Sequence, residues 1–206
     1  MIDAVVFDIG RVLLDWQPEV FYDKKIGVDR RRSLFAECDL HEMNKAIDLG
    51  SHSRDVAYAH AEKHPAWADE IRLWHDSWIE MASPDIPGSA TILRALKAKG
   101  FPIFSLTNFG VNTLDWAKTH YSVLTEFDLE FISGELGLVK PDPAIYDHVE
   151  RHSGVSPDRL IFTDDSPANI AAAAKRGWKT HLFDGPKGWA DRLISEGLLS
   201  DEDIRD

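Results

Sequence analysis

Five short runs of apolar residues, separated by stretches with helical periodicity, dominate the pattern of this chain. A short continuous apolar run is typical of a strand that is covered on both faces of a sheet. Such runs predict strands at 4–7, 102–107, 130–133, 159–163 and 179–183. Helices are predicted between the later runs, at 88–99, 143–152 and 168–176. This alternation favours βαβ units, so we predict an α/β fold with a parallel sheet.

Residues 17–84 interrupt the alternation, and no apolar run typical of a strand occurs in them. Helical patterns are predicted there at 18–25, 29–38, 41–48, 53–63 and 66–82. The last stretch carries a stripe of large apolar residues, most of which we expect to pack inside a helical bundle. We therefore predict a core of residues 1–16 and 85–206, with a helical insert at 17–84. The insert follows the first strand, and ligands of open α/β sheets bind at the carboxyl ends of strands.

Composition narrows the possible functions. The chain has 206 residues, of which 35 are acidic and 23 basic, and its net charge of −12 argues against a nucleic-acid or anionic-membrane surface. The single cysteine, Cys38, excludes an intramolecular disulfide and a cysteine metal cage. No apolar run approaches the roughly 20 residues of a membrane span, and the N-terminus does not resemble a signal peptide. We expect a soluble cytoplasmic protein.

Polar residues capable of chemistry stand at or just beyond the ends of the predicted strands. Asp8 directly follows the first strand, where a carboxylate is held rigidly enough to act as a nucleophile. Thr107 and Asn108 end the second strand, and their hydroxyl and amide can hydrogen-bond an anion. Each residue alone is equally typical of a turn.

Two further segments add charge. Lys140 stands in a loop that two prolines stiffen. Asp164 and Asp165 follow the fourth strand, and adjacent carboxylates repel each other unless a cation or protons compensate them. The acidic pair is therefore the least ordinary of these segments.

In their order along the chain and in their amino-acid sequence, these segments resemble the four motifs of the haloacid dehalogenase superfamily of hydrolases. The resemblance covers the whole chain, with the helical insert in the place of the family's C1 cap. The matching segments are Phe7-Asp8, Thr107-Asn108, Lys140-Pro141-Asp142-Pro143 and Asp164-Asp165-Ser166. The resemblance implies a Rossmann-like core and a covalent aspartyl intermediate.

A magnesium-dependent phosphatase is the function that this resemblance implies. Phosphoryl transfer needs an in-line nucleophile, here Asp8, and neutralisation of the phosphate oxygens. Mg²⁺ prefers oxygen ligands. Asp8, Asp164 and Asp165 offer carboxylates, and the resemblance adds the main-chain carbonyl of Gly10. Lys140 would hold phosphate and offset carboxylate repulsion.

Phosphate binding completes the expected site. Thr107 and Asn108 would donate hydrogen bonds to the phosphate oxygens. The expected partner is a small phosphorylated metabolite. Loop 48–51 of the insert, with Trp78 and His52, is the expected source of specificity.

Gly10 departs from the family pattern. Most family phosphatases have a second Asp two residues after the nucleophile, which serves as general acid and base. Here that position is Gly10, followed by Arg11 where Gly is usual. The segment Asp8-Ile9-Gly10-Arg11-Val12 is similar instead to the Asp-x-Gly-Asn-Val motif of a family branch that includes sugar-1-phosphate phosphatases. Glycine cannot transfer a proton, so we expect a preference for substrates with acidic leaving groups.

Other interpretations remain. A 2-haloacid dehalogenase would not need the acid missing at Gly10, but such enzymes use no metal and hold their substrate with an arginine, for which Arg11 and the run 30–32 are candidates. Asp164 and Asp165 argue against this, because they would raise the pKa of Asp8. A catalytically idle binding protein is a second alternative. Two histidine pairs at i, i+4 spacing, 60/64 and 148/152, are expected at the surface rather than on a metal.

Overall fold

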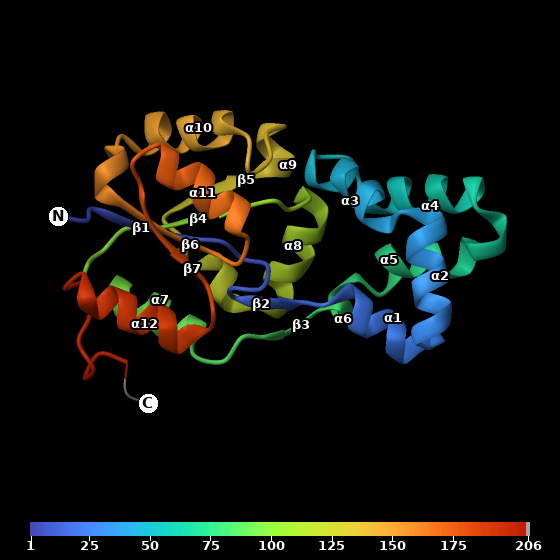
Figure 1. Ribbon diagram of the computed structural model, residues 1–206, viewed down its shortest axis with the longest axis horizontal. Helices are drawn as coiled ribbons and strands as arrows, with labels where there is room; N and C mark the ends of the chain where they lie inside the picture. The colour runs from blue at the N-terminus through green and yellow to red at the C-terminus, as the bar shows by residue number, and fades with distance from the viewer. Residues whose placement is uncertain (205–206) are drawn as a thin grey trace.

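A five-stranded parallel sheet organises the computed structural model, which describes residues 1–204 (Figure 1). Its strand order is β5-β4-β1-β6-β7. The strands are β1 (Ala4–Phe7), β4 (Ile103–Thr107), β5 (Leu129–Ile132), β6 (Leu160–Asp164) and β7 (Lys179–Leu182). The predicted α/β fold with a parallel sheet is confirmed. Each end of the five predicted strands lies within one residue of the observed end.

Both faces of the sheet are covered by helices. Along β1, Ala4 and Val6 belong to one apolar cluster while Val5 and Phe7 belong to the other. The helices on one face are α10 (Pro143–Ser153) and α11 (Pro167–Lys175). Those on the other are α7 (Ser89–Ala98), α8 (Val111–His120) and α12 (Pro186–Ser195). Strand β1 is buried on both sides, which explains its unbroken apolar sequence.

The helical insert lies beside the sheet, at the right of Figure 1. Its helices are α1 (Pro18–Ile26), α2 (Val28–Cys38), α3 (Leu40–Asp48), α4 (Ser53–Lys63), α5 (Ala68–Asp76) and α6 (Trp78–Met81), with a 3-10 turn η1 (Pro65–Trp67). The prediction of one helix over 66–82 was wrong, because the helix is broken at Ser77. Trp78 packs on Trp16 and Phe109, with ring centroids 5.6 and 5.3 Å away. These contacts direct α6 toward the sheet, and the periodicity of the sequence does not reveal such a change of direction.

Two strands that the sequence pattern did not predict join the insert to the core. β2 (Leu14–Trp16) and β3 (Ala82–Asp85) form an antiparallel ribbon, in which Trp16 faces Ala82. They were missed because they are short and because β3 is polar and largely exposed.

Small elements complete the chain. They are η2 (Ser122–Thr125), α9 (Ser133–Leu136) and η3 (Pro157–Arg159). Within residues 1–204, no helix combines the length and apolar character that crossing a membrane requires.

Candidate active site

The order of the strands brings the predicted polar residues together. β1 lies between β4 and β6, and the three strands are parallel, so their carboxyl ends meet at one edge. Asp8 follows β1, Thr107 ends β4 and Asp164 ends β6. All three side chains are buried, although Asp8 and Thr107 line a polar cavity.

Lys140 is the centre of this group. Its buried ammonium lies 2.9 Å from Asp8 Oδ1 and 2.6 Å from Asp164 Oδ2, and donates to the main-chain oxygen of Leu106 at 2.8 Å. Three acceptors match the three protons of an ammonium group. Lys140 therefore offsets the repulsion between two buried carboxylates.

Burial and charge set the protonation of these groups. Burial raises the pKa of Asp8 to about 7; Lys140 opposes that rise and Asp164 adds to it. Burial alone would lower the pKa of Lys140, but the neighbouring carboxylates outweigh it, and the pKa is raised. Burial, with the charge of Asp164, also raises the pKa of Asp165. The cluster thus carries more negative charge than Lys140 alone balances.

Two asparagines hold the charged residues in position. Asn108 makes a reciprocal pair with the main chain of Lys140: its Nδ2 donates to the Lys140 oxygen at 2.9 Å and its Oδ1 accepts from the Lys140 nitrogen at 2.8 Å. Asn169 donates to both oxygens of Asp164 at 3.0 Å. The role of Asn108 in phosphate binding stays a prediction; its side chain lines the polar cavity and also positions Lys140.

The carboxylates can hold a divalent cation. Asp8, Asp164 and Asp165 each offer an oxygen, and these oxygens lie within 4.8 Å of one another. An oxygen-only donor set with excess negative charge suits Mg²⁺. Arg11 Nη1 lies 3.7 Å from Asp165 Oδ2.

Arg11 and Gly10 form a tight turn after Asp8. Arg11 has a φ of 57°, in the left-handed region that usually favours glycine. Its Nε donates to the main-chain oxygen of Trp16 at 3.2 Å, which holds the turn against β2. A Cβ atom placed on Gly10 would meet no heavy atom closer than Trp16 Cβ, at 4.0 Å. Space beside Gly10 is therefore open.

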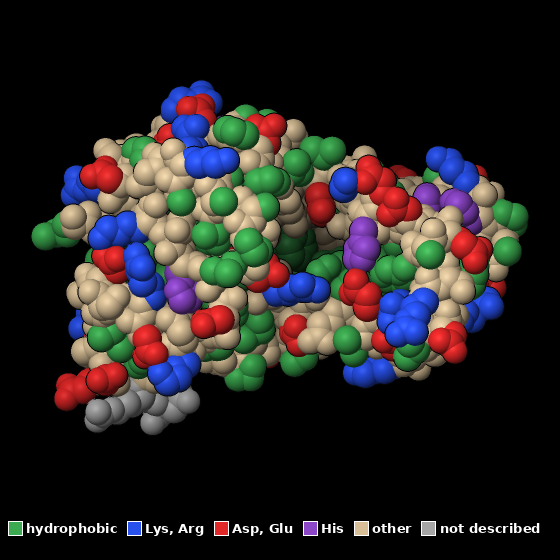
Figure 2. Space-filling view, in the orientation of Figure 1, with side chains coloured by type: hydrophobic (Ala, Val, Ile, Leu, Met, Phe, Trp, Pro, Cys, Tyr) green, Lys and Arg blue, Asp and Glu red, His purple; other side chains and the backbone are tan. Residues whose placement is uncertain are grey.

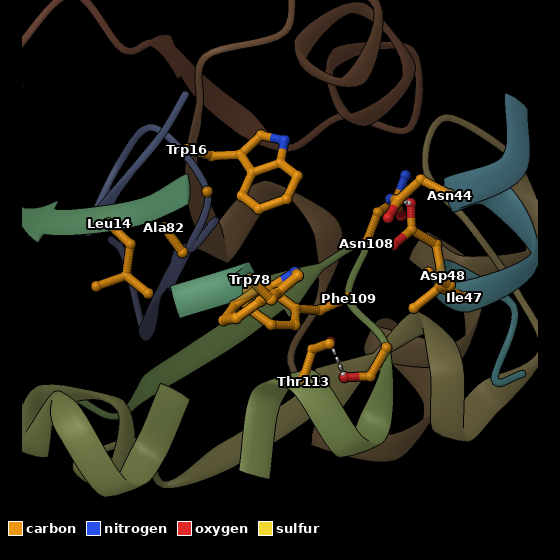
Figure 3. Close-up of a pocket in the computed structure, with 12 residues that line it drawn as sticks. Leu14, Trp16, Asn44, Ile47, Asp48, Trp78, Ala82, Asn108, Phe109 and Thr113 are labelled. Atoms are coloured by element: carbon orange, nitrogen blue, oxygen red, sulfur yellow. Dashed lines mark hydrogen bonds between the residues drawn. The ribbon is translucent and has the colours of Figure 1, made fainter. Parts of the chain in front are cut away.

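Two cavities meet at this turn, in the hollow between the sheet and the insert that Figure 2 shows. The polar cavity, about 310 Å³, is lined by Asp8, Thr107, Lys140 and Asp165 among others. The second cavity, about 110 Å³, is mainly apolar (Figure 3). Its walls include Leu14, Ile47, Asp48, Trp78, Ala82 and Phe109. Gly10, Trp16 and Asn108 line both cavities, so the two spaces adjoin.

Of the other residues considered in the sequence, some line the two cavities and others lie elsewhere. Trp78 lines the apolar cavity, while His52 lines neither cavity. Arg30 and Arg31 form ion pairs with Glu70 and Asp23 within the insert, away from both cavities. The ring of His60 contacts that of His64, and no metal-ligating histidine cluster occurs within residues 1–204.

A family comparison agrees with the motifs. The model of the haloacid dehalogenase-like hydrolase family matches residues 2–177. This chain belongs to that family. The resemblance seen in the sequence is confirmed, and the protein is a haloacid dehalogenase-like hydrolase.

Relatives of this hydrolase include phosphatases. The chain is 26% identical over 183 residues to the sesquiterpene phosphatase astK of Aspergillus oryzae, covering 88% of this chain and 90% of that protein. It is 22% identical over 213 residues to the D-ribitol-5-phosphate phosphatase of Bacteroides thetaiotaomicron, covering 94% and 97% of the two chains.

Solved structures share the fold of this hydrolase. A haloacid dehalogenase family enzyme from Bacteroides thetaiotaomicron, in complex with magnesium and inorganic phosphate, has a TM-score of 0.70 at 21% identity, covering 94% and 100% of the two chains. The L-2-haloacid dehalogenase of Xanthobacter autotrophicus has a TM-score of 0.62 at 18% identity, covering 97% and 85%. The fold alone therefore does not separate phosphatase from dehalogenase.

Proposed function

We propose that this hydrolase is a Mg²⁺-dependent phosphatase, which cleaves small phosphorylated metabolites through an aspartyl-phosphate intermediate on Asp8. The observation that carries the proposal is the cluster of Asp8, Asp164 and Asp165 around Lys140, at the floor of a polar cavity. A phosphoryl group needs such a combination of nucleophile and positive charge.

Asp8 has one oxygen free for attack. Its Oδ1 accepts from the Ile9 nitrogen at 2.8 Å and lies 2.9 Å from Lys140 Nζ, which leaves Oδ2 to reach phosphorus. Lys140 and the hydroxyl of Thr107 would orient the phosphate oxygens. Mg²⁺, held by Asp8, Asp164, Asp165 and the Gly10 carbonyl, would neutralise charge on the phosphoryl group. Water then hydrolyses the aspartyl phosphate.

The adjoining apolar cavity supports a proposal about the size of the substrate's organic part. The organic part of a phosphate ester bound at Asp8 can pass Gly10 into the space beside Trp16 and Trp78. At about 110 Å³ this space is smaller than the roughly 150 Å³ cavity that can bind benzene, so it limits the enclosed group to one small ring at most. Sugar 1-phosphates are candidate substrates because their anomeric hydroxyl is a comparatively acidic leaving group. The two related phosphatases support the reaction type.

The dehalogenase alternative fits the site less well. Arg11 is the arginine that lines the polar cavity, and Asp165 already neutralises it at 3.7 Å. The fully buried Asp164 also contributes to the raised pKa of Asp8, which weakens a nucleophile that works without a cation.

Hydrolysis of 4-nitrophenyl phosphate tests the proposal. Asp8→Asn should lower turnover by at least about 10³-fold, because an amide does not attack phosphorus. Asp3→Asn, at the opposite end of β1, is the matched control and should keep the wild-type rate. Chelation with EDTA should abolish wild-type activity, and added Mg²⁺ should restore it. Undiminished hydrolysis by folded Asp8→Asn, or chloride release from 2-chloropropionate in EDTA, would contradict the proposal.

A further inference from the structure

The apolar cavity contains one carboxyl group that the mechanism above does not use. Asp48 is the last residue of α3, and it lines the apolar cavity together with Gly10 and Asn108. Figure 3 shows Asp48 gathered with Asn44 and Asn108 on one side of the cavity, with the indole of Trp16 on the other. The carboxyl thus stands beside the passage that the organic part of a substrate would enter.

Hydrogen bonds fix the direction of this carboxyl. Trp74 Nε1 donates to Asn44 Oδ1 at 2.9 Å, which sets the orientation of the Asn44 amide. Asn44 Nδ2 therefore faces Asp48 and donates to its Oδ2 at 3.1 Å. Within residues 1–204, the other oxygen of Asp48, Oδ1, has no hydrogen-bond partner and is available to a ligand.

The end of α3 is also fastened to the sheet. Ser133, the first residue of α9 directly after β5, donates its Oγ hydrogen to the main-chain oxygen of Asp48 at 2.6 Å. Two residues later, a Cβ on Gly50 would lie 2.4 Å from the main-chain oxygen of Gly134. This hydrogen bond and the close main-chain approach of Gly50 to Gly134 place Asp48 at a defined position relative to the site.

The environment of Asp48 favours its protonated form. Burial raises its pKa to about 7, while the Asn44 hydrogen bond and the charge of Lys140 oppose the rise. Lys140 is the charged group that acts on it, since the rest of its surroundings are amide and apolar side chains. A general acid works best when its pKa lies near the operating pH.

We infer that Asp48 is the general acid that protonates the leaving group, in place of the carboxyl missing at Gly10; this rests on the proposed phosphatase function. Asp8 Oδ2 forms a bond to phosphorus as the bond from phosphorus to the ester oxygen breaks. That oxygen keeps the electron pair and takes the proton of Asp48, which releases an alcohol. In the second step, water loses a proton to the Asp48 carboxylate as it attacks phosphorus. Free Asp8, inorganic phosphate and protonated Asp48 result.

This assignment changes the expectation drawn from Gly10. A donor in the cavity lets the wild-type protein cleave ordinary alkyl phosphates, and the preference for acidic leaving groups becomes a property of a variant without Asp48. The residue two positions after the nucleophile can then be glycine without loss of acid catalysis.

Two aromatic esters of similar size separate proton donation from binding. Benzyl phosphate has a poor leaving group that needs a proton, whereas 4-nitrophenyl phosphate releases a stable phenolate. With Mg²⁺, Asp48→Asn should lower kcat/KM for benzyl phosphate by about 10²–10⁴-fold and for 4-nitrophenyl phosphate by less than about 3-fold. Asp55→Asn, an exposed carboxyl in the first turn of α4, is the matched control and should change neither value.

A second measurement needs no variant. In the wild type, the ratio of kcat/KM for benzyl phosphate to that for 4-nitrophenyl phosphate should fall as the pH rises above about 7, because Asp48 loses its proton there. The ratio cancels titrations that affect both substrates. A ratio constant with pH, or an equal loss of both activities in Asp48→Asn, would overturn the role of Asp48. Absence of any Asp8-dependent hydrolysis of 4-nitrophenyl phosphate would instead refute the phosphatase function itself.

Discussion

Asp8 and Asp48 are two carboxyl groups for which burial raises the pKa to about 7, yet their surroundings differ in kind. Asp8 lies against a lysine ammonium and within reach of two more carboxylates, so a bound cation would favour its ionised form. Asp48 faces an amide and apolar rings, which a cation at the carboxylate cluster would affect much less. Pairs of acids divided in this way commonly take opposite roles in proton transfer.

The protonation of Asp48 can be measured through stability. Because its pKa is higher in the folded than in the unfolded protein, the folded state binds the extra proton between about pH 4 and pH 7. Stability is therefore lost as the pH rises through that window. Asp48→Asn removes this loss and should raise the free energy of unfolding at about pH 8 by up to about 4 kcal/mol, since raising the pKa by about three units is worth about 1.4 kcal/mol per unit.

Urea unfolding of both proteins at about pH 4 and pH 8 checks this expectation. The difference between them should be much smaller at the lower pH, where Asp48 is protonated in the folded state and about half protonated in the unfolded chain. Equal differences at the two pH values would show that Asp48 carries an ordinary carboxylate in the folded protein.

At the scale of elements, the sequence predicted what local pattern determines. The five core strands and the polar residues at their ends followed from apolar runs and chain position, and parallel order then brings Asp8, Thr107 and Asp164 together. The ribbon of β2 and β3 was not predictable, because strands of three and four residues are too short to show a period, and β3 is largely exposed. The role argued for Asp48 was also out of reach, since its cavity forms only where α3 meets loops of the core. Loop 48–51 was singled out for specificity, but nothing in it signals a buried acid.

The contact between α3 and the core depends on a glycine. Gly50 has a φ of 104°, and a methyl group there would collide with the main-chain oxygen of Gly134. Gly27, between α1 and α2, has a comparable φ of 84° but no atom within 4 Å of such a methyl. Gly50→Ala should therefore destabilise the protein by about 1–3 kcal/mol more than Gly27→Ala, because overpacking adds to the shared backbone strain.

Thermal unfolding of the two variants measures that difference. Gly50→Ala should also slow cleavage of benzyl phosphate more than that of 4-nitrophenyl phosphate, since it displaces Asp48 from the cavity. Equal effects of the two alanines on stability would mean that the contact at Gly134 is easily relieved.

At the scale of the whole molecule, charge opposes substrate capture. The net charge is −12, and the two cations that line the polar cavity, Arg11 and Lys140, are both paired with carboxylates. A phosphate dianion is therefore repelled at long range. Raising NaCl from about 0.01 to 0.15 M shortens the screening length from about 30 to 8 Å, so kcat/KM should rise while kcat stays constant. A falling kcat/KM would reveal a local positive potential strong enough to dominate the net charge.

The ribbon of β2 and β3, which joins the core to the insert, has a consequence for how such proteins can evolve. Trp16 and Ala82 are direct partners, so the helical insert leaves and re-enters the core at a single point. A different set of helices spliced between these two residues would replace the wall formed by Ile47, Asp48 and Trp78. The residues around Lys140 would keep their places. Substrate range and the source of the proton can thus be inherited as one interchangeable module, separately from the chemistry at phosphorus.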